Sequence, residues 1–205
     1  MSWFVQWRER RARRRLTSKD LFVRYEAAKW LLLRRGDASV IAVLLECLHE
    51  SDYVTWPLIC EFAAATLSRY GYQGPRPING ITNRLRKTAS ASQAGHLLRA
   101  LSYLAPRDAL DAIEIVLNRD STYFRVDDAN TATGAAILPT FTGTTGQYVR
   151  VLAARLLGDF GNESSVNTLR SAAVDADSQV RAAAVSALET IQGRSAPGRP
   201  EAQQP

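Results

Sequence analysis

Few residues of this sequence are of types that could perform catalysis or bind a metal ion. It holds two histidines, His49 and His96, and two cysteines, Cys47 and Cys60, which fall on predicted apolar helix faces. Cys47 and His49 lie roughly 200° apart around one predicted helix, so they cannot share a metal ion without another element. The sequence also lacks a Cys-x-x-Cys pair, a glycine-rich phosphate loop and a Gly-x-Ser-x-Gly motif. We therefore expect no catalytic residue, no metal site, no cofactor and no enzymatic activity.

A block of arginines near the N-terminus is the strongest charged feature. Residues 1–35 carry 11 of the 26 basic and 3 of the 20 acidic residues, so the net charge of +6 is a local property. The block consists of Arg8, Arg10, Arg11, Arg13, Arg14 and Arg15. Such residues could bind the phosphates of nucleic acid. With Trp3, Phe4 and Trp7 they could also form a helix that lies on a membrane surface. We favour a third interpretation, in which these aromatic residues pack as a cap and the arginines face solvent.

Residues 121–146 form a long segment without helical spacing, rich in Thr, Gly and Ala. A long loop of this kind in a compact domain is usually functional or disordered. It contains charged and aromatic residues of the types found in interface hot spots. These candidate partner-binding residues are Tyr123, Phe124, Arg125, Asp127, Asp128 and Phe141. We expect the loop to contribute to binding a partner protein, and a passive insertion is the alternative.

The remaining sequence is arranged as helices that repeat one pattern. Val149-Arg150 and Val180-Arg181 each begin a predicted helix whose apolar residues follow the spacing of a half-buried helix. The two pairs are 31 residues apart, and Val54 follows Val23-Arg24 by the same 31 residues. Self-similarity at such a period predicts an all-α protein, specifically an α-solenoid.

Short polar segments separate the predicted helices and define three parts of the chain. Asp20 and Asp177 each precede a Val-Arg helix by three residues, where a carboxylate can accept hydrogen bonds from free N–H groups. We predict a basic capping helix over residues 1–19, the repeat domain over residues 20–192, and a disordered tail over residues 193–205.

The pattern Val-Arg-x-x-Ala-Ala…Leu-Gly-x-x-Gly…Val-x-x-Leu…Asp-x-Asp-x-x-Val-Arg over residues 147–191 resembles the HEAT-like repeat family, in the short form of the phycobilin lyases. The resemblance implies a right-handed superhelix of about five helix pairs, with the Val-Arg helices on its concave side. It also implies an internal ladder of charged residues. The members of this ladder would be Asp20, Arg24, Arg150, Asp177 and Arg181.

These features leave three functions open. We expect a non-enzymatic scaffold that binds another protein through the concave helix face and the 121–146 loop. The alternative is a nucleic-acid-binding protein, of a DNA-repair type, that uses the arginine block. A bilin lyase activity would rest on the repeat family alone, and a fold does not define a function. No apolar run of about 18 residues occurs, so we expect no membrane-spanning helix and a cytoplasmic location.

Overall fold

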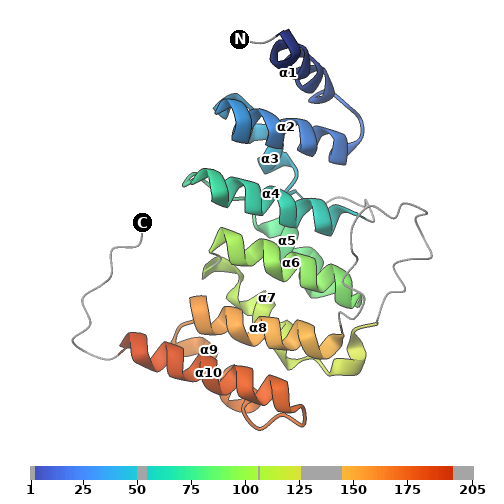
Figure 1. Ribbon diagram of the computed structural model, residues 1–205. Coiled ribbons are helices and arrows are strands. Elements are labelled where there is room, and N and C mark those ends of the chain that lie inside the picture. The colour runs from blue at the N-terminus through green and yellow to red at the C-terminus, as the bar shows by residue number, and fades with distance from the viewer. Residues whose placement is uncertain (1–2, 50–54, 106, 126–144, 196–205) are drawn as a thin grey trace. The chain divides into compact units, whose positions relative to one another are not determined.

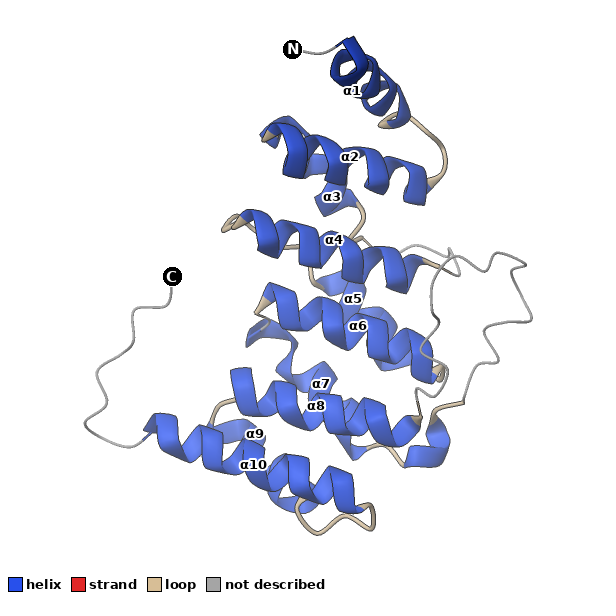
Figure 2. Ribbon diagram, in the orientation of Figure 1, coloured by secondary structure: helices blue, strands red, loops and turns tan. Residues whose placement is uncertain are grey.

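The computed structural model describes residues 3–49, 55–105, 107–125 and 145–195. Within these ranges the regular elements are helices, and successive helices pack on their neighbours within each of the two units described below (Figure 1, Figure 2). This arrangement confirms the prediction of an all-α fold of the solenoid type. None of the described helices is both long and apolar enough to cross a membrane.

The chain forms two compact units, which we describe separately. The first comprises Met1–Thr88 and His96–Pro106, and the second comprises Ala89–Gly95 and Arg107–Pro205. Helix α6 (Ala91–Leu104) contributes residues to both units.

The first unit contains the helices that the sequence predicts around the Val23 and Val54 copies. In chain order they are α1 (Trp3–Arg15), α2 (Leu21–Arg35), η1 (Ala38–Val40), α3 (Ile41–Glu46), α4 (Trp56–Tyr70) and α5 (Asn79–Lys87). Helix α2 contacts α1, α3 and α4, so its apolar side is covered by its neighbours in the chain.

The second unit contains the two repeats with the clearest sequence pattern. Its elements are η2 (Arg107–Ala109), α7 (Leu110–Asn118), η3 (Ser121–Tyr123), α8 (Gly146–Phe160), α9 (Glu163–Ala172) and α10 (Ser178–Ser195). Helices α8 and α10 lie side by side, and α7 and α9 pack against them (Figure 1). The Val-Arg residues therefore begin neighbouring helices of one layer.

Side-chain caps and glycine backbone conformations set the ends of the helices where the sequence predicts them. The carboxylate of Asp20 accepts hydrogen bonds from the N–H groups of Phe22 and Val23, at 2.8 and 3.2 Å, and so caps α2. Gly36 and Gly71 follow α2 and α4 with φ values of 64° and 78°, which glycine adopts without steric strain. Asp and Gly thus define the start and the stop of α2.

Small side chains let α8 and α10 approach closely. A Cβ atom built on Gly158 would lie 2.9 Å from the Cα atom of Ala187, closer than such carbon atoms normally come. Val149, Ala153 and Ala184 are fully buried in the same layer. The interface between the two helices is therefore packed at backbone contact distance.

We expect Gly158→Leu to lower the free energy of unfolding by about 1–3 kcal/mol, because the added side chain must push α10 away. Urea unfolding followed by circular dichroism measures this loss. Gly193→Leu is the matched control, since nothing lies within 4 Å of a Cβ atom built there. Equal stability of the two variants would contradict the close approach.

Helix α1 contacts α2, but the predicted packing of its aromatic residues is wrong. Trp3, Phe4 and Trp7 are 76%, 50% and 43% exposed. The opposite side of the helix faces α2, where Ala12 is buried and the carboxylate of Glu9 pairs with the Arg35 guanidinium over 2.9 Å. The helical period places the aromatic rings on the side away from these contacts.

The last helix is longer than its sequence suggests. Helix α10 ends at Ser195 rather than at residue 192, so the first three residues of the predicted 193–205 tail are helical, and residues 196–205 lie outside the described residues. The guanidinium of Arg194 donates hydrogen bonds to the carbonyl oxygens of Asp159 and Gly161, at the end of α8. This contact stabilises a final turn that the glycine at position 193 would otherwise weaken.

Candidate functional site

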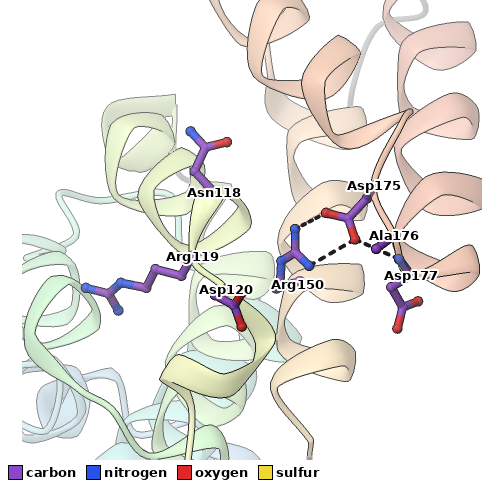
Figure 3. A pocket seen from close by; sticks show the side chains of 7 residues that line it. All are labelled: Asn118, Arg119, Asp120, Arg150, Asp175, Ala176 and Asp177. Carbon is purple, nitrogen blue, oxygen red and sulfur yellow. Dashed lines mark hydrogen bonds and ion pairs between the residues drawn. The ribbon is translucent and has the colours of Figure 1, made fainter.

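Arg150, near the start of α8, connects three segments of the second unit (Figure 3). It is 8% exposed, and its Nε donates a hydrogen bond to the carbonyl oxygen of Leu117 over 3.0 Å. Its Nη1 donates to Oδ1 of Asp175 over 3.2 Å, and its Nη2 donates to the other oxygen of that carboxylate. Arg150 thereby satisfies a carbonyl at the end of α7 and holds the turn between α9 and α10.

The charge of Asp175 is stabilised by this contact. The hydrogen bonds from Arg150 hold the pKa of the Asp175 carboxyl below its usual range, although burial opposes this effect. The backbone N–H of Asp177 also donates to Oδ1 of Asp175, over 2.9 Å (Figure 3). The pair is therefore an ionised, bidentate contact between neighbouring repeats.

An open cleft of about 540 Å³ surrounds this pair. Its lining residues are Asn118, Arg119, Asp120, Arg150, Asp175, Ala176 and Asp177 (Figure 3). Asp120 accepts a hydrogen bond from the N–H of Thr122 over 2.7 Å, and the Arg119 guanidinium lies 4.2 Å from the centroid of the Tyr123 ring. Because its charged side chains already stabilise turns and rings, we interpret the cleft as a joint between repeats.

The predicted ladder has a different acidic member in the second unit. Asp177 accepts hydrogen bonds from the N–H groups of Gln179 and Val180, so it caps α10 and does not pair with Arg181. Arg181 instead donates to the carbonyl oxygen of Asp175, over 2.6 Å. The Asp-x-Asp of the repeat motif carried this information, since one aspartate caps a helix and the other pairs with the arginine of the preceding repeat.

The corresponding residues of the first unit also do not pair as predicted. Asp20 caps α2, and Arg24 donates to the carbonyl oxygen of Ser18 over 3.4 Å and to Glu46 over 3.1 Å. The Glu46 side chain is 55% exposed, so this contact is weaker than the one made by Arg150. The first unit therefore has no equivalent of the buried Arg150–Asp175 pair at Arg24.

The candidate residues of the 121–146 loop are described in part. Tyr123 is 40% exposed, whereas Phe124 is 4% exposed and has the Arg119 guanidinium over its ring, so Phe124 cannot serve as a surface contact. Arg125 donates its N–H to the carbonyl oxygen of Ala89 over 2.7 Å, and its side chain is exposed. The remaining candidates lie outside the described residues: Asp127, Asp128 and Phe141.

A second hollow runs between α8 and α10 on their exposed side. It measures about 490 Å³ and is lined by Val151, Arg155, Gly158, Asp159, Gln179, Ala182, Ala183, Ser186, Ala187 and Thr190. Small residues form its floor, and the exposed side chains of Arg155 and Asp159 lie along one edge. The sequence pattern did not reveal this groove, although its residues follow helical spacing on α8 and α10.

Helices α4 and α6 bring together a polar cluster in the first unit that the sequence did not reveal. Nδ1 of His96 lies 2.6 Å from Oε2 of Glu61, and Nε of Arg99 donates to Oε1 of Glu61 over 3.0 Å. Burial raises the pKa of the Glu61 carboxyl, but the hydrogen bonds from His96 and Arg99 outweigh it and leave this pKa below its usual range. The Glu61 carboxylate and the Arg99 guanidinium neutralise each other's charge in this cluster.

The cysteines are confirmed as buried, free thiols. Burial raises the pKa of Cys47 to about 12 and raises that of Cys60 well above its ordinary value. Both therefore remain protonated and pack as small apolar side chains. Among the described residues, no three His, Cys, Asp or Glu side chains are grouped as a metal site requires.

The arginine block of α1 is exposed along its length. Arg13 pairs with Glu9 over 3.2 Å and with Asp37 over 2.9 Å. The guanidinium groups of Arg8 and Arg11 lie 4.7 and 5.4 Å from the ring centroids of Phe4 and Trp7. The other members, Arg10, Arg14 and Arg15, are also solvent-accessible.

Comparison with known proteins supports the repeat assignment. Residues 136–204 match a family model described as HEAT repeats, and this range includes α8, α9 and α10. The match does not distinguish a phycobilin-lyase subtype. No curated protein and no solved structure matches the chain. The repeat pattern and the packing of α8, α9 and α10 agree with this match, which identifies HEAT repeats over residues 136–204.

Proposed function

We propose that the protein is a scaffold that binds a helical segment of a partner protein in the groove between α8 and α10. HEAT repeats typically mediate protein interactions through the surfaces of their stacked helices. The single observation that supports this proposal is the groove itself, which is open and lined by small side chains. Among the described candidates of the 121–146 loop, Tyr123 and Arg125 have exposed side chains, which suits an additional contact.

The chemistry of the groove favours an amphipathic helix as its occupant. Ala183 and Ala187, which are 9% and 3% exposed, are small, so apolar side chains of a partner can pack onto the surface above them. Arg155 and Asp159 are four residues apart on α8 and exposed. A partner helix with an acidic and a basic residue one turn apart would match both charges.

The two helices that form the groove are held in fixed positions. This lowers the entropy cost of binding, because few side chains and no loop of the groove must become ordered. Gly158 brings α8 and α10 to backbone contact. The Arg150 guanidinium, near the start of α8, binds Asp175 in the turn before α10. The Arg194 guanidinium, near the end of α10, binds the carbonyl oxygen of Gly161 after α8.

Photo-crosslinking tests the proposal. A crosslinking amino acid at Ser186, in the groove, should capture a partner protein that the same amino acid at Ser171, on α9, does not capture. Ala182→Arg should reduce that capture about tenfold or more, because an arginine would fill the groove. Ser171→Arg is the matched control and should leave capture unchanged. The same partner captured equally at both positions would contradict the proposal.

A further inference from the structure

The outward side of α1 carries an aromatic cluster that no other described element covers. Trp3, Phe4 and Trp7 are 76%, 50% and 43% exposed, and the rings of Phe4 and Trp7 stack with their centroids 6.2 Å apart. Exposed apolar clusters of this kind on a soluble surface usually mark a binding site.

Arginines continue the same side of the helix toward its C-terminal end. At 100° per residue, Arg11 and Arg14 fall within the sector that holds the aromatic rings, and Arg10 and Arg15 lie about 20° beyond its two edges. The aromatic residues occupy the first turns, and the arginines extend over roughly another 10 Å of the helix axis. The outward side therefore has an apolar end and a basic end.

The acidic group of α1 does not reduce this positive charge on the outward side. Glu9 is the acidic residue of the helix, and its carboxylate lies on the inner side, 2.9 Å from the Arg35 guanidinium. Arg13, which pairs with Glu9 and Asp37, also lies away from the aromatic sector. The outward side is thus purely cationic and aromatic.

We propose that α1 docks the protein on an anionic lipid surface. The aromatic end enters the boundary between headgroups and acyl chains, where the rings of tryptophan and phenylalanine are favoured. The arginines that follow bind lipid phosphates, and their alkyl stems lie along the surface of the apolar region.

The arrangement of the rings favours lipid over nucleic acid. Base stacking on a protein uses the open face of an aromatic ring. One face of Phe4 is covered by Arg8, one face of Trp7 is covered by Arg11, and the two rings stack on each other. Phe4 and Trp7 nevertheless remain 50% and 43% exposed, and this remaining surface can insert into an apolar medium. The separation of apolar and basic ends also suits a surface with an apolar interior and a charged boundary.

Vesicle co-sedimentation of the full chain tests the proposal. We expect binding to vesicles of phosphatidylcholine with about one-third phosphatidylserine, and weaker binding as the salt concentration rises or when the anionic lipid is omitted. The double substitution Phe4→Ser and Trp7→Ser should lower binding about tenfold. Arg11→Gln and Arg14→Gln should each lower it about fivefold.

The controls change the same residue types elsewhere. The control variants are Val174→Ser and Arg170→Gln. Val174 is 81% exposed, and Arg170 is exposed on α9. Both variants should bind vesicles as strongly as the parent protein does. Circular dichroism establishes that each variant is folded.

Three results would overturn the proposal. One is an absence of vesicle binding at low salt. Another is binding that needs the arginines but not Phe4 and Trp7, which indicates simple adsorption of charge. The third is tight, salt-dependent binding to single-stranded or duplex DNA together with no vesicle binding, which would assign α1 to nucleic acid.

Discussion

Replacing Trp56 with alanine is expected to lower the free energy of unfolding by about 3–5 kcal/mol, among the largest losses for a single change in this protein. Trp56 is fully buried at the start of α4 and leads the largest buried side chains of the described residues. Its removal would leave a cavity among neighbours that can collapse only in part.

The Trp56 side chain also makes a specific polar contact. Its Nε1 donates a hydrogen bond to the carbonyl oxygen of Cys47, over 3.0 Å, at the end of the preceding helix. Trp56→Phe keeps most of the ring but leaves this buried carbonyl without its donor, so we expect a loss of about 1–3 kcal/mol. The contact joins α4 to the turn after α3, and it is therefore specific to this pair of helices.

Urea unfolding followed by circular dichroism gives the two values. Trp3→Ala is the matched control, because Trp3 is 76% exposed and its removal should change stability by no more than about 0.5 kcal/mol. A loss of less than about 1 kcal/mol in Trp56→Ala would contradict the packing of α4. A Trp56→Phe variant as unstable as Trp56→Ala would show that the hydrogen bond, and not the ring volume, carries the effect.

The sequence predicts the helices well because their ends depend on neighbouring residues. Asp20 and Asp177 precede Val-Arg helices and cap them, as their position in the sequence indicates. Gly36 and Gly71 end helices through a left-handed backbone conformation that other residues adopt at a cost. These interactions span only a few residues, and so single-sequence patterns reveal them.

The contacts between repeats are less predictable, since they depend on which residue of a neighbouring element is nearest. Asp177 was expected in the charged ladder, but capping occupies its carboxylate and Asp175 reaches Arg150 instead. The Glu61 and His96 pair joins residues 35 positions apart. Arg194 extends α10 past a glycine by contacts with the end of α8.

The side of α1 that packs against the protein could not be predicted from the sequence. Its hydrophobic residues suggest a buried side, yet the helix packs through Ala12 and the ion pair of Glu9 with Arg35. An amphipathic pattern identifies two sides of a helix, but it does not state which side meets the protein. The exposed Trp3 and Trp7 are therefore a structural finding, and the lipid proposal depends on it.

Replacing Arg150 with alanine should destabilise the second unit by about 3–5 kcal/mol, because Asp175 would keep its charge in a partly buried position without its partner. The carbonyl oxygen of Leu117 would lose its donor as well. Arg170→Ala, at an exposed position of α9, is the matched control and should cost no more than about 0.5 kcal/mol. Urea unfolding at neutral pH measures both.

The pH dependence identifies the ion pair as the cause. The pKa of Asp175 is lowered in the folded protein, so its contribution to stability is complete above the unfolded pKa of about 4 and is lost as the pH falls through the folded value. The difference in stability between the parent protein and Arg150→Ala should therefore narrow from pH 7 to pH 3. A difference independent of pH would point to lost packing of the arginine stem instead.

A double-mutant cycle separates the pair from its surroundings. If the Arg150–Asp175 contact joins the repeats, Asp175→Ala and Arg150→Ala together should cost less than the sum of the two single changes, with a coupling of about 1–3 kcal/mol. Asp175→Asn keeps an acceptor for the guanidinium but removes the charge, so it should fall between the parent and Asp175→Ala. Additive losses would mean that Arg150 stabilises the unit through the Leu117 carbonyl alone, and the framing of the α8–α10 groove would then depend on Gly158 and Arg194.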